Sequence, residues 1–221
     1  MRRPFWALIL LMDRAFFITG TDTNVGKTVL SALLCAALQG RYWKPVQTGA
    51  REGTDREQVK TWAGLDGDRV LPESYLLDEP VSPHLAARLA GQEIVLKKIT
   101  PPALVSGLPL IVEGAGGVMV PINSRQLMTD LMRHLNMPVV LAARSTLGTI
   151  NHSLLSLERL RNEGIRVLGV VLIGPENHEN RKAIEHYGQV QVIGQIPVLE
   201  SINKNSLCHV YNCHFNKETF A

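Results

Sequence analysis

The segment GTDTNVGKT, residues 20–28, ends in the Gly-Lys-Thr triplet that is typical of phosphate-binding loops. It lies between an apolar run at 15–18 and a helix-like run at 29–34, which is the strand–loop–helix context that such a loop needs. Five residues separate Gly20 from Gly26, whereas the standard pattern has four. A glycine turn with a chance triplet is the alternative, but the flanking runs favour a nucleotide site.

The residue types in this loop match the chemistry of triphosphate binding. Glycines let backbone N–H groups turn inward around phosphate oxygens, and the start of the following helix adds favourable dipole charge. Lys27 would reach the β- and γ-phosphates, and the Thr28 hydroxyl would bind Mg²⁺. We therefore predict a site for a nucleoside triphosphate at this loop.

A second candidate element is LIVEGAGG, residues 110–117. Glu113 ends an apolar strand-like run, at the sheet edge where ligands of open α/β sheets bind. Gly114, Gly116 and Gly117 are expected to form a glycine-rich loop that allows close backbone approach. We expect Glu113 to lie near the metal, and the alternative is an exposed carboxylate beside a turn.

The polar segments between these elements carry weaker signals. Asp55 is a candidate third acid, but composition alone does not separate it from Glu52 or Glu57. Lys44 precedes Pro45 and is therefore expected in extended backbone near a turn. Taken alone, Lys44 is interpreted as a solvated surface lysine rather than a catalytic one.

Three further segments have ambiguous patterns. DEPVSPH (78–84) predicts a proline-rich connection with a helix start at Ser82-Pro83. TLGTINH (146–152) predicts a glycine turn and then a helix start, which would be an anion site or a simple cap. CHVYNCH (208–214) suggests a metal site, but its spacing fits no common zinc pattern, and an unstructured tail is the expectation.

The elements that must position these residues are predicted by apolar runs alternating with helical patterns. The strand-like runs are 15–20, 108–114, 137–143, 165–174 and 190–197, and the helical patterns are 26–39, 127–135, 150–164 and 180–188. The runs are continuously apolar, as expected for strands covered on both faces. We predict one α/β domain at 15–200, with a doubly wound, mostly parallel sheet and helices on both faces. Residues 1–14 are expected to be an extension or the start of the first strand, and 201–221 stay unassigned.

The composition bounds the class of protein. The 221 residues are 45% hydrophobic and 19% charged, which is typical of a soluble globular domain. A net charge of +3 without a long Lys/Arg block argues against a nucleic-acid surface. Cys35, Cys208 and Cys213 make no disulfide framework, and Cys35 is expected to be a small buried thiol. The N-terminal MRRPFWALILLM imitates a signal peptide, but no cleavage site follows and it is too short to span a bilayer, so we expect a cytoplasmic protein.

The motifs together resemble one family. GTDTNVGKT, KPVQTG, EPVSPH, VEGAGG and LGTINH occur in the order and approximate spacing of the dethiobiotin synthetases, which belong to the P-loop NTPase superfamily. The resemblance runs from about residue 16 to residue 197, and the five-residue gap is that family's own form of the loop.

The resemblance implies an ATP-dependent ring closure by a C–N-forming ligase. The substrate, 7,8-diaminopelargonic acid, takes up CO₂ as a carbamate, whose oxygen attacks the γ-phosphate of MgATP. The second amine then attacks the resulting carbamic–phosphoric anhydride and closes the cyclic urea of dethiobiotin, with release of ADP and phosphate. The resemblance also implies a homodimer, with neither nucleic acid nor membrane as a partner.

Residue roles follow from the same resemblance. Lys27 and Lys44 would flank the carbamate and the γ-phosphate, and Thr23 and Thr48 would contact one of these groups. The implied Mg²⁺ ligands are Thr28, Asp55 and Glu113. The implied nucleotide-binding residues are Asn24, Val25, Gly26, Lys27, Thr28, Glu113, Gly114, Gly116, Gly117 and Pro197. The substrate carboxylate would be bound by the helix start at Gly148, Thr149 and Asn151, contributed by the neighbouring subunit.

The chain departs from the family pattern at several positions. Asn24 replaces a glutamate found in some relatives, and Thr48 stands where serine is frequent. Ile173-Gly174 stands where members carry an Asn-Asp pair whose asparagine reads adenine, so the preferred base stays open, with Asn177 as a substitute reader. The segment after residue 197 is unlike the family's.

Three alternative classes are weighed against this resemblance. Cobyrinic acid a,c-diamide synthases share the fold and the loop style but carry a glutaminase domain, and Cys208 lies in a patternless tail. Partition or septum-positioning ATPases have an extra lysine early in the loop, whereas residues 21–25 contain none. They also need a basic patch or a terminal amphipathic helix. A nucleotide binder without turnover is the third alternative.

Overall fold

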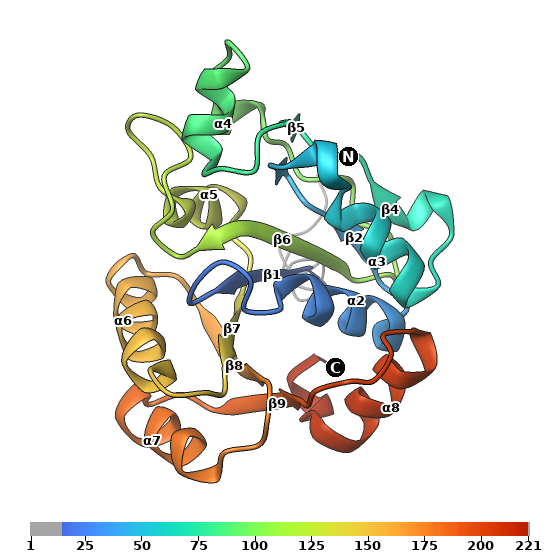
Figure 1. Cartoon of the computed structure of the whole chain (residues 1–221), viewed down its shortest axis with the longest axis vertical. Helices are drawn as coiled ribbons and strands as arrows, with labels where there is room; N and C mark the ends of the chain where they lie inside the picture. The colour runs from blue at the N-terminus through green and yellow to red at the C-terminus, as the bar shows by residue number, and fades with distance from the viewer. Residues whose placement is uncertain (1–14, 221) are drawn as a thin grey trace, which may run out of the picture.

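The computed structural model describes residues 15–220, and the predicted N-terminal extension lies outside the described residues. The main sheet has seven strands in the order β4-β2-β6-β1-β7-β8-β9 (Figure 1). Every neighbouring pair in this sheet is parallel, which confirms the prediction of a parallel, doubly wound sheet. The strands are β1 Ala15–Gly20, β2 Arg41–Trp43, β4 Val70–Leu71, β6 Leu110–Gly117, β7 Val139–Arg144, β8 Val167–Ile173 and β9 Val192–Ile196.

Helices follow the strands along the chain. They are α2 Lys27–Leu38, α3 Asp55–Ala63, α4 Pro83–Leu89, α5 Met128–Leu135, α6 Thr149–Asn162, α7 His178–Gly188 and α8 Lys204–His214. A second, two-stranded sheet joins β3 Val46–Gln47 to β5 Tyr75–Leu76. Short 3₁₀ helices are η1 Ala50–Glu52, η2 Gly67–Arg69, η3 Leu96–Lys98 and η4 Lys217–Phe220.

The core has two layers, one on each face of the sheet. Phe16 packs in the layer beneath α2, α3 and α8, whereas Phe17 packs in the layer beneath α4, α5, α6 and α7. Figure 1 shows α2, α3 and α8 on the right of the sheet and α5, α6 and α7 on its left. Neighbouring strand residues thus bury opposite faces, as the continuously apolar runs predicted. Each fully buried large side chain stabilises the fold by roughly 1.5–3 kcal/mol, so these layers hold the strand ends in place.

Local sequence signals determine where helices α3 and α4 begin. Thr54 caps α3 through a capping box, in which its hydroxyl accepts from the backbone N–H of Glu57 and the Glu57 carboxylate accepts from the backbone N–H of Thr54. The hydrogen bond from the Thr54 backbone N–H to the Glu57 carboxylate, followed by the one from the Thr54 hydroxyl, lowers the pKa of Glu57. Ser82 precedes α4 and Pro83 is its first residue, so the predicted helix start is confirmed.

The C-terminal segment is helical, and the expectation of an unstructured tail is wrong. Helix α8 begins after Asn203, whose side-chain oxygen accepts from two backbone N–H groups, and it buries Leu207, Val210 and Tyr211 against the α2 layer. The ring of Phe220 then packs edge-on against Phe16 with the centroids 5.5 Å apart. The tail therefore completes one face of the core.

The helix also decides the interpretation of the Cys/His segment. His209 and Cys213 lie one turn apart on its exposed side, with Sγ and Nε2 3.8 Å from each other. Among residues 15–220, no group of three or more His, Cys, Asp or Glu side chains is arranged to hold a metal ion. In the same range, no helix combines the length and apolarity that crossing a bilayer requires.

Candidate active site

The loop between β1 and α2 has the tight backbone that phosphate binding requires. Asn24 and Gly26 have positive φ angles of 57° and 97°, so the chain turns sharply just before the helix. A Cβ on Gly20 would come within 2.9 Å of the Asp22 carbonyl oxygen, so only glycine fits there. Lys27 folds back over the loop, and its Nζ donates to that same Asp22 carbonyl at 3.0 Å.

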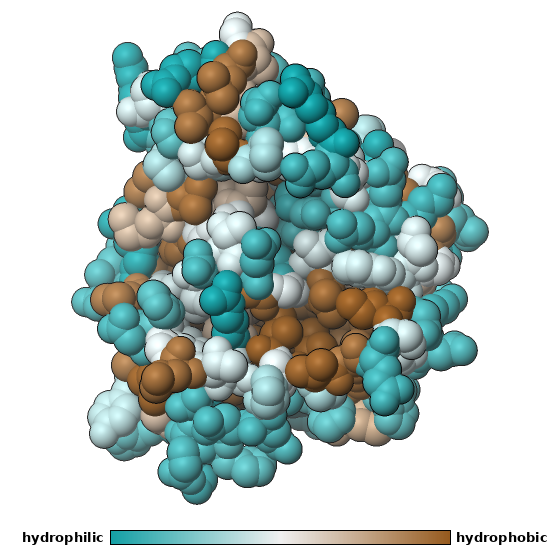
Figure 2. Space-filling view, in the orientation of Figure 1, coloured by the Kyte–Doolittle hydropathy of each residue, from teal (hydrophilic) through white to brown (hydrophobic). Residues whose placement is uncertain are grey.

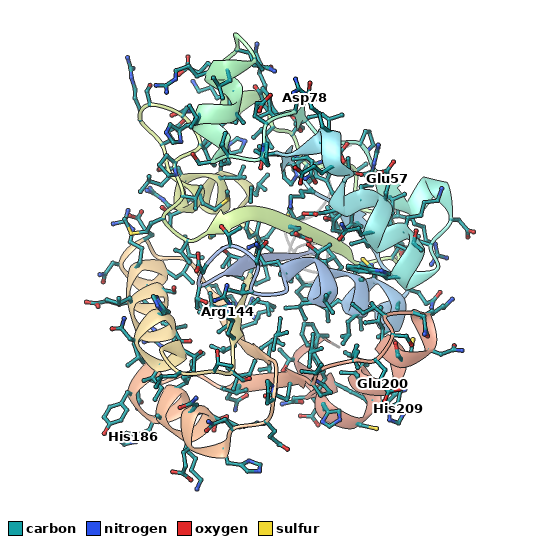
Figure 3. The ribbon with its side chains drawn as sticks, viewed as in Figure 1. Glu57, Asp78, Arg144, His186, Glu200 and His209 are labelled. Carbon is teal, nitrogen blue, oxygen red and sulfur yellow. The ribbon has the colours of Figure 1, made fainter. Side chains whose placement is uncertain are left out.

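Lys27 is buried against this loop. Burial is the main reason that its pKa falls to about 8, and the nearby Glu113 opposes part of that fall. Arg144, at the end of β7, donates Nη2 to the Thr23 carbonyl at 3.2 Å and so fastens the outer part of the loop (Figure 3). Arg144 belongs to no recognisable motif, because its partner is 121 residues away in the chain.

Strand β6 differs from its prediction in length. It continues through Gly117, so Gly114, Gly116 and Gly117 lie within the strand rather than in a glycine-rich loop. Gly114 is needed for packing, because a Cβ there would come 2.9 Å from the Phe17 ring. Glu113 is 1% exposed, and the alternative of an exposed strand-end carboxylate is therefore wrong.

The Glu113 carboxylate is the centre of a buried polar cluster. Its Oε1 accepts from the Thr28 hydroxyl at 3.0 Å and from Lys44 Nζ at 3.2 Å. Its Oε2 accepts from the Tyr42 hydroxyl at 3.0 Å. Burial, followed by the charge of Glu113, raises the pKa of Tyr42 well above its ordinary value, so this phenol is a hydrogen-bond donor at neutral pH.

Lys44 joins this cluster, and its interpretation as a solvated surface lysine is wrong. It is 6% exposed and forms ion pairs with both Asp55 and Glu113. Burial alone would lower the pKa of Lys44, but the two carboxylates outweigh burial and the pKa is raised. Lys44 is therefore a cation in this cluster.

The structure separates the three acids that the composition left equivalent. Asp55 begins α3, pairs with Lys44, and donates its backbone N–H to Gln47 Oε1 at 3.1 Å. Glu57 is committed to the helix cap, and Figure 3 shows it on α3. Glu52 is exposed at the rim of the cavity that Asp55 lines.

A cavity of about 700 Å³ contains most of the predicted nucleotide-site residues. Those lining it are Thr23, Asn24, Gly26, Lys27, Thr28, Lys44, Thr48, Asp55, Glu113 and Gly116. The predicted residues outside its lining are Val25, Gly114, Gly117, Pro197, Gly148, Thr149 and Asn151. Residues 80–83 also line the cavity, so the proline-rich connection contributes to the site.

The start of α6 stands apart from this cavity. Gly148 has a φ of 93° and precedes the helix, and Thr149 is buried while Asn151 is exposed. The resemblance assigns this helix start to a neighbouring subunit's site. Its position outside the cavity of its own chain is compatible with that arrangement, which stays a prediction.

A hydrophobic surface lies beside the loop on the side away from this cavity. Figure 2 shows it between α2 and α8. Ile173, at the end of β8, contacts the loop so closely that a Cβ on Gly26 would lie 2.9 Å from its Cδ1. Ile173 has no polar group to offer a nucleobase.

A parallel sheet, a glycine loop between its central strand and a helix, and a buried carboxylate on the adjacent strand define a P-loop nucleoside triphosphatase. The model of a family described as "AAA domain" matches residues 14–206. The ATP-dependent dethiobiotin synthetases BioD of Brucella ovis and Brucella suis biovar 1 are each 46% identical over 210 residues, which cover 95% of this chain and 98% of theirs. The chain belongs to the dethiobiotin synthetase family.

Solved structures with a similar fold are more distant in sequence. A ParA family ATPase from Chlorobium tepidum is 12% identical, with a TM-score of 0.48 over 90% of each chain. A similarity at this level does not bear on activity.

Proposed function

We propose that this chain is an ATP-dependent dethiobiotin synthetase that acts in the cytoplasm on 7,8-diaminopelargonic acid and CO₂. The observation that carries the proposal is the convergence of Lys27, Lys44, Thr28, Asp55 and Glu113 in one cavity beside the phosphate loop. That cavity, of about 700 Å³, has room for a triphosphate and a small substrate side by side.

The proposed reaction has three steps. CO₂ adds to one amine, which loses a proton and becomes a carbamate. A carbamate oxygen attacks the γ-phosphorus of ATP, the bond to the β-phosphate oxygen breaks, and ADP leaves. The second amine attacks the carbonyl carbon of the mixed anhydride, the bond to the phosphate oxygen breaks, and phosphate leaves as the amine loses its proton and the urea ring closes.

The proposed roles of the side chains are positioning and charge stabilisation. Lys44, held as a cation by its two carboxylates, would lie between the carbamate and the transferred phosphoryl group. Lys27 would reach the same phosphoryl group from the loop side, and Thr23 and Thr48 would contact the carbamate or phosphate. Such fixed groups stabilise the charge that develops on the phosphoryl oxygens in the transition state.

The residues present also fit Mg²⁺. Thr28, Asp55 and Glu113 offer a hydroxyl and two carboxylates, and the Thr28 hydroxyl is already 3.0 Å from Glu113 Oε1. Mg²⁺ in sites of this kind takes one or two carboxylates and completes its shell with substrate phosphates and water. When bound, the ion would neutralise charge on the β- and γ-phosphates.

A second copy of the chain is proposed to complete the site. The start of α6 is flanked by apolar side chains that are exposed in the single chain, with Leu147 fully exposed and Leu155 58% exposed. Met119, which is 54% exposed, lies with Leu155 on a cavity of about 370 Å³ between α6 and the end of β6. An isologous dimer would cover these residues and bring the partner's helix start to the substrate carboxylate.

The testing experiment is phosphate release by the purified protein with ATP, Mg²⁺ and bicarbonate, with and without diaminopelargonate. We expect diamine-dependent phosphate and dethiobiotin, identified by mass spectrometry. Lys27→Ala should abolish both, whereas Lys182→Ala, which removes an exposed lysine on α7, should change neither. Hydrolysis stimulated by DNA or lipid but indifferent to the diamine would instead indicate a switch ATPase, and ATP binding without turnover would indicate a binder.

A further inference from the structure

Tyr42 is a buried residue that the proposed reaction leaves without a role. It lies on β2, is 0% exposed, and pairs in parallel register with Ile111 on β6. Side chains two residues apart on a strand share a face, so Tyr42 and Lys44 lie on the same side as Ile111 and Glu113. Glu113 is therefore the diagonal cross-strand neighbour of Tyr42, within reach of a long side chain.

The two carboxylate oxygens of Glu113 accept hydrogen bonds from different groups. Oε1 faces Thr28 and Lys44, which both line the proposed nucleotide cavity. Oε2 faces away from these groups and accepts the Tyr42 hydroxyl at 3.0 Å. Among the hydrogen bonds of residues 15–220, that hydroxyl is the one donor to Oε2.

We propose that Tyr42 is a positioning residue for the metal site: its hydroxyl holds Glu113 Oε2 and thereby keeps Oε1 directed at the Thr28 hydroxyl and Mg²⁺. The inference rests on the proposed function for the presence of Mg²⁺. A carboxylate that ligates a metal is itself oriented by a hydrogen bond, and loss of such a partner typically lowers metal affinity or activity by about 10–100-fold.

The decisive variant is Tyr42→Phe, which removes the hydroxyl and keeps the ring that packs in the core. The measurement is the affinity for ATP by calorimetry, once in EDTA and once in saturating Mg²⁺. The ratio of the two dissociation constants is the Mg²⁺ gain, which reports how much the metal strengthens ATP binding. We expect Tyr42→Phe to bind ATP in EDTA as the wild type does, within about twofold, and to lose about tenfold or more of the gain due to Mg²⁺.

A matched control removes a tyrosine hydroxyl elsewhere. Tyr75 accepts a hydrogen bond from the backbone N–H of Val95 at 3.0 Å, outside the cavity lining. Tyr75→Phe should leave the Mg²⁺ gain unchanged. A Tyr42→Phe variant that keeps the full gain, or that loses affinity equally in EDTA and in Mg²⁺, would overturn the inference, because a purely structural role predicts one of these results.

A second measurement needs no variant and covers the case in which Tyr42→Phe does not fold. In a crystal structure of the wild type with Mg²⁺ and a non-hydrolysable ATP analogue, Tyr42 Oη should remain hydrogen-bonded to Glu113 Oε2 while Oε1 faces the ion. A structure in which the Tyr42 hydroxyl has left Glu113, or bonds to the same carboxylate oxygen that faces the ion, would contradict the inference. Loss of the Mg²⁺ gain in a protein that shows no diamine-dependent turnover would refute the proposed function and leave the role of Tyr42 standing.

Discussion

Replacing Lys44 with methionine should destabilise the protein as well as inactivate it. Lys44 is the cation between Asp55 and Glu113, and the side chains of the three are 7%, 22% and 0% exposed. Methionine keeps the length of the side chain but leaves Glu113 as a buried carboxylate without its countercharge. Removing one partner of a buried ion pair costs about 3–5 kcal/mol.

The expected change is large enough to measure by thermal unfolding. For a domain of this size, 1 kcal/mol shifts the melting temperature by roughly 2–4 °C, so Lys44→Met should lower it by about 6–20 °C at neutral pH without nucleotide. Diamine-dependent phosphate release should fall below detection. The surface control Lys182→Met breaks an exposed ion pair with Glu179 and should leave both readouts unchanged.

The double variant Lys44→Met/Glu113→Gln tests whether the unpaired charge of Glu113 causes the loss of stability. The amide removes the unpaired charge, so the double variant should melt at a higher temperature than Lys44→Met while remaining inactive. The reasoning would be refuted by a Lys44→Met protein that melts within about 2 °C of the wild type. A Lys44→Met protein that retains diamine-dependent turnover would equally refute the reasoning.

Three further predictions concern other parts of the fold. Burial raises the pKa of Tyr211, so the folded protein retains the phenol proton at a pH where the unfolded chain loses it. The free energy of unfolding should therefore decline as the pH rises above about 10. Tyr211→Phe should reduce that decline in urea unfolding measured over a pH series. In Gly194→Ala the new methyl group would lie 2.5 Å from the Phe215 ring and should cost about 1–3 kcal/mol in thermal melts, whereas Gly67→Ala, with no atom within 4 Å, should be nearly neutral. Ile173→Asn supplies a hydrogen-bonding group beside the phosphate loop and should raise the ATP-to-CTP ratio of kcat/KM by about threefold to tenfold, and an unchanged ratio would show that residue 173 does not meet the base.

The parallel sheet and the phosphate loop were predictable because their signals are local. Strands buried on both faces need unbroken apolar runs, and β1, β6, β7, β8 and β9 each carry one. The short strands β2 and β4 and the pair β3 and β5 have two or three residues each, too few to display any period. Their place in the fold is set by pairing with distant strands, which the sequence does not display.

The features that were not predicted from the sequence also depend on contacts between residues far apart in the chain. Tyr42 has the appearance of an ordinary core aromatic residue, and its partner Glu113 is 71 positions away. Helix α8 did carry a signal, since Leu207, Val210 and Tyr211 have the spacing of one helical face. That stripe spans little more than one turn among polar residues, so its stability comes from packing against α2 rather than from propensity.

The charges of the site lead us to expect a dependence on Mg²⁺. Two lysines, Lys27 and Lys44, face two carboxylates, Asp55 and Glu113, so two positive and two negative charges cancel. This balance allows the groups to be buried together in the folded chain. A triphosphate would then add negative charge to a cluster that has no positive charge in excess, so a further cation is needed. The Thr28 hydroxyl and the two carboxylates offer hard oxygen ligands at the point where the phosphates would enter, and we therefore expect ATP without Mg²⁺ to bind weakly.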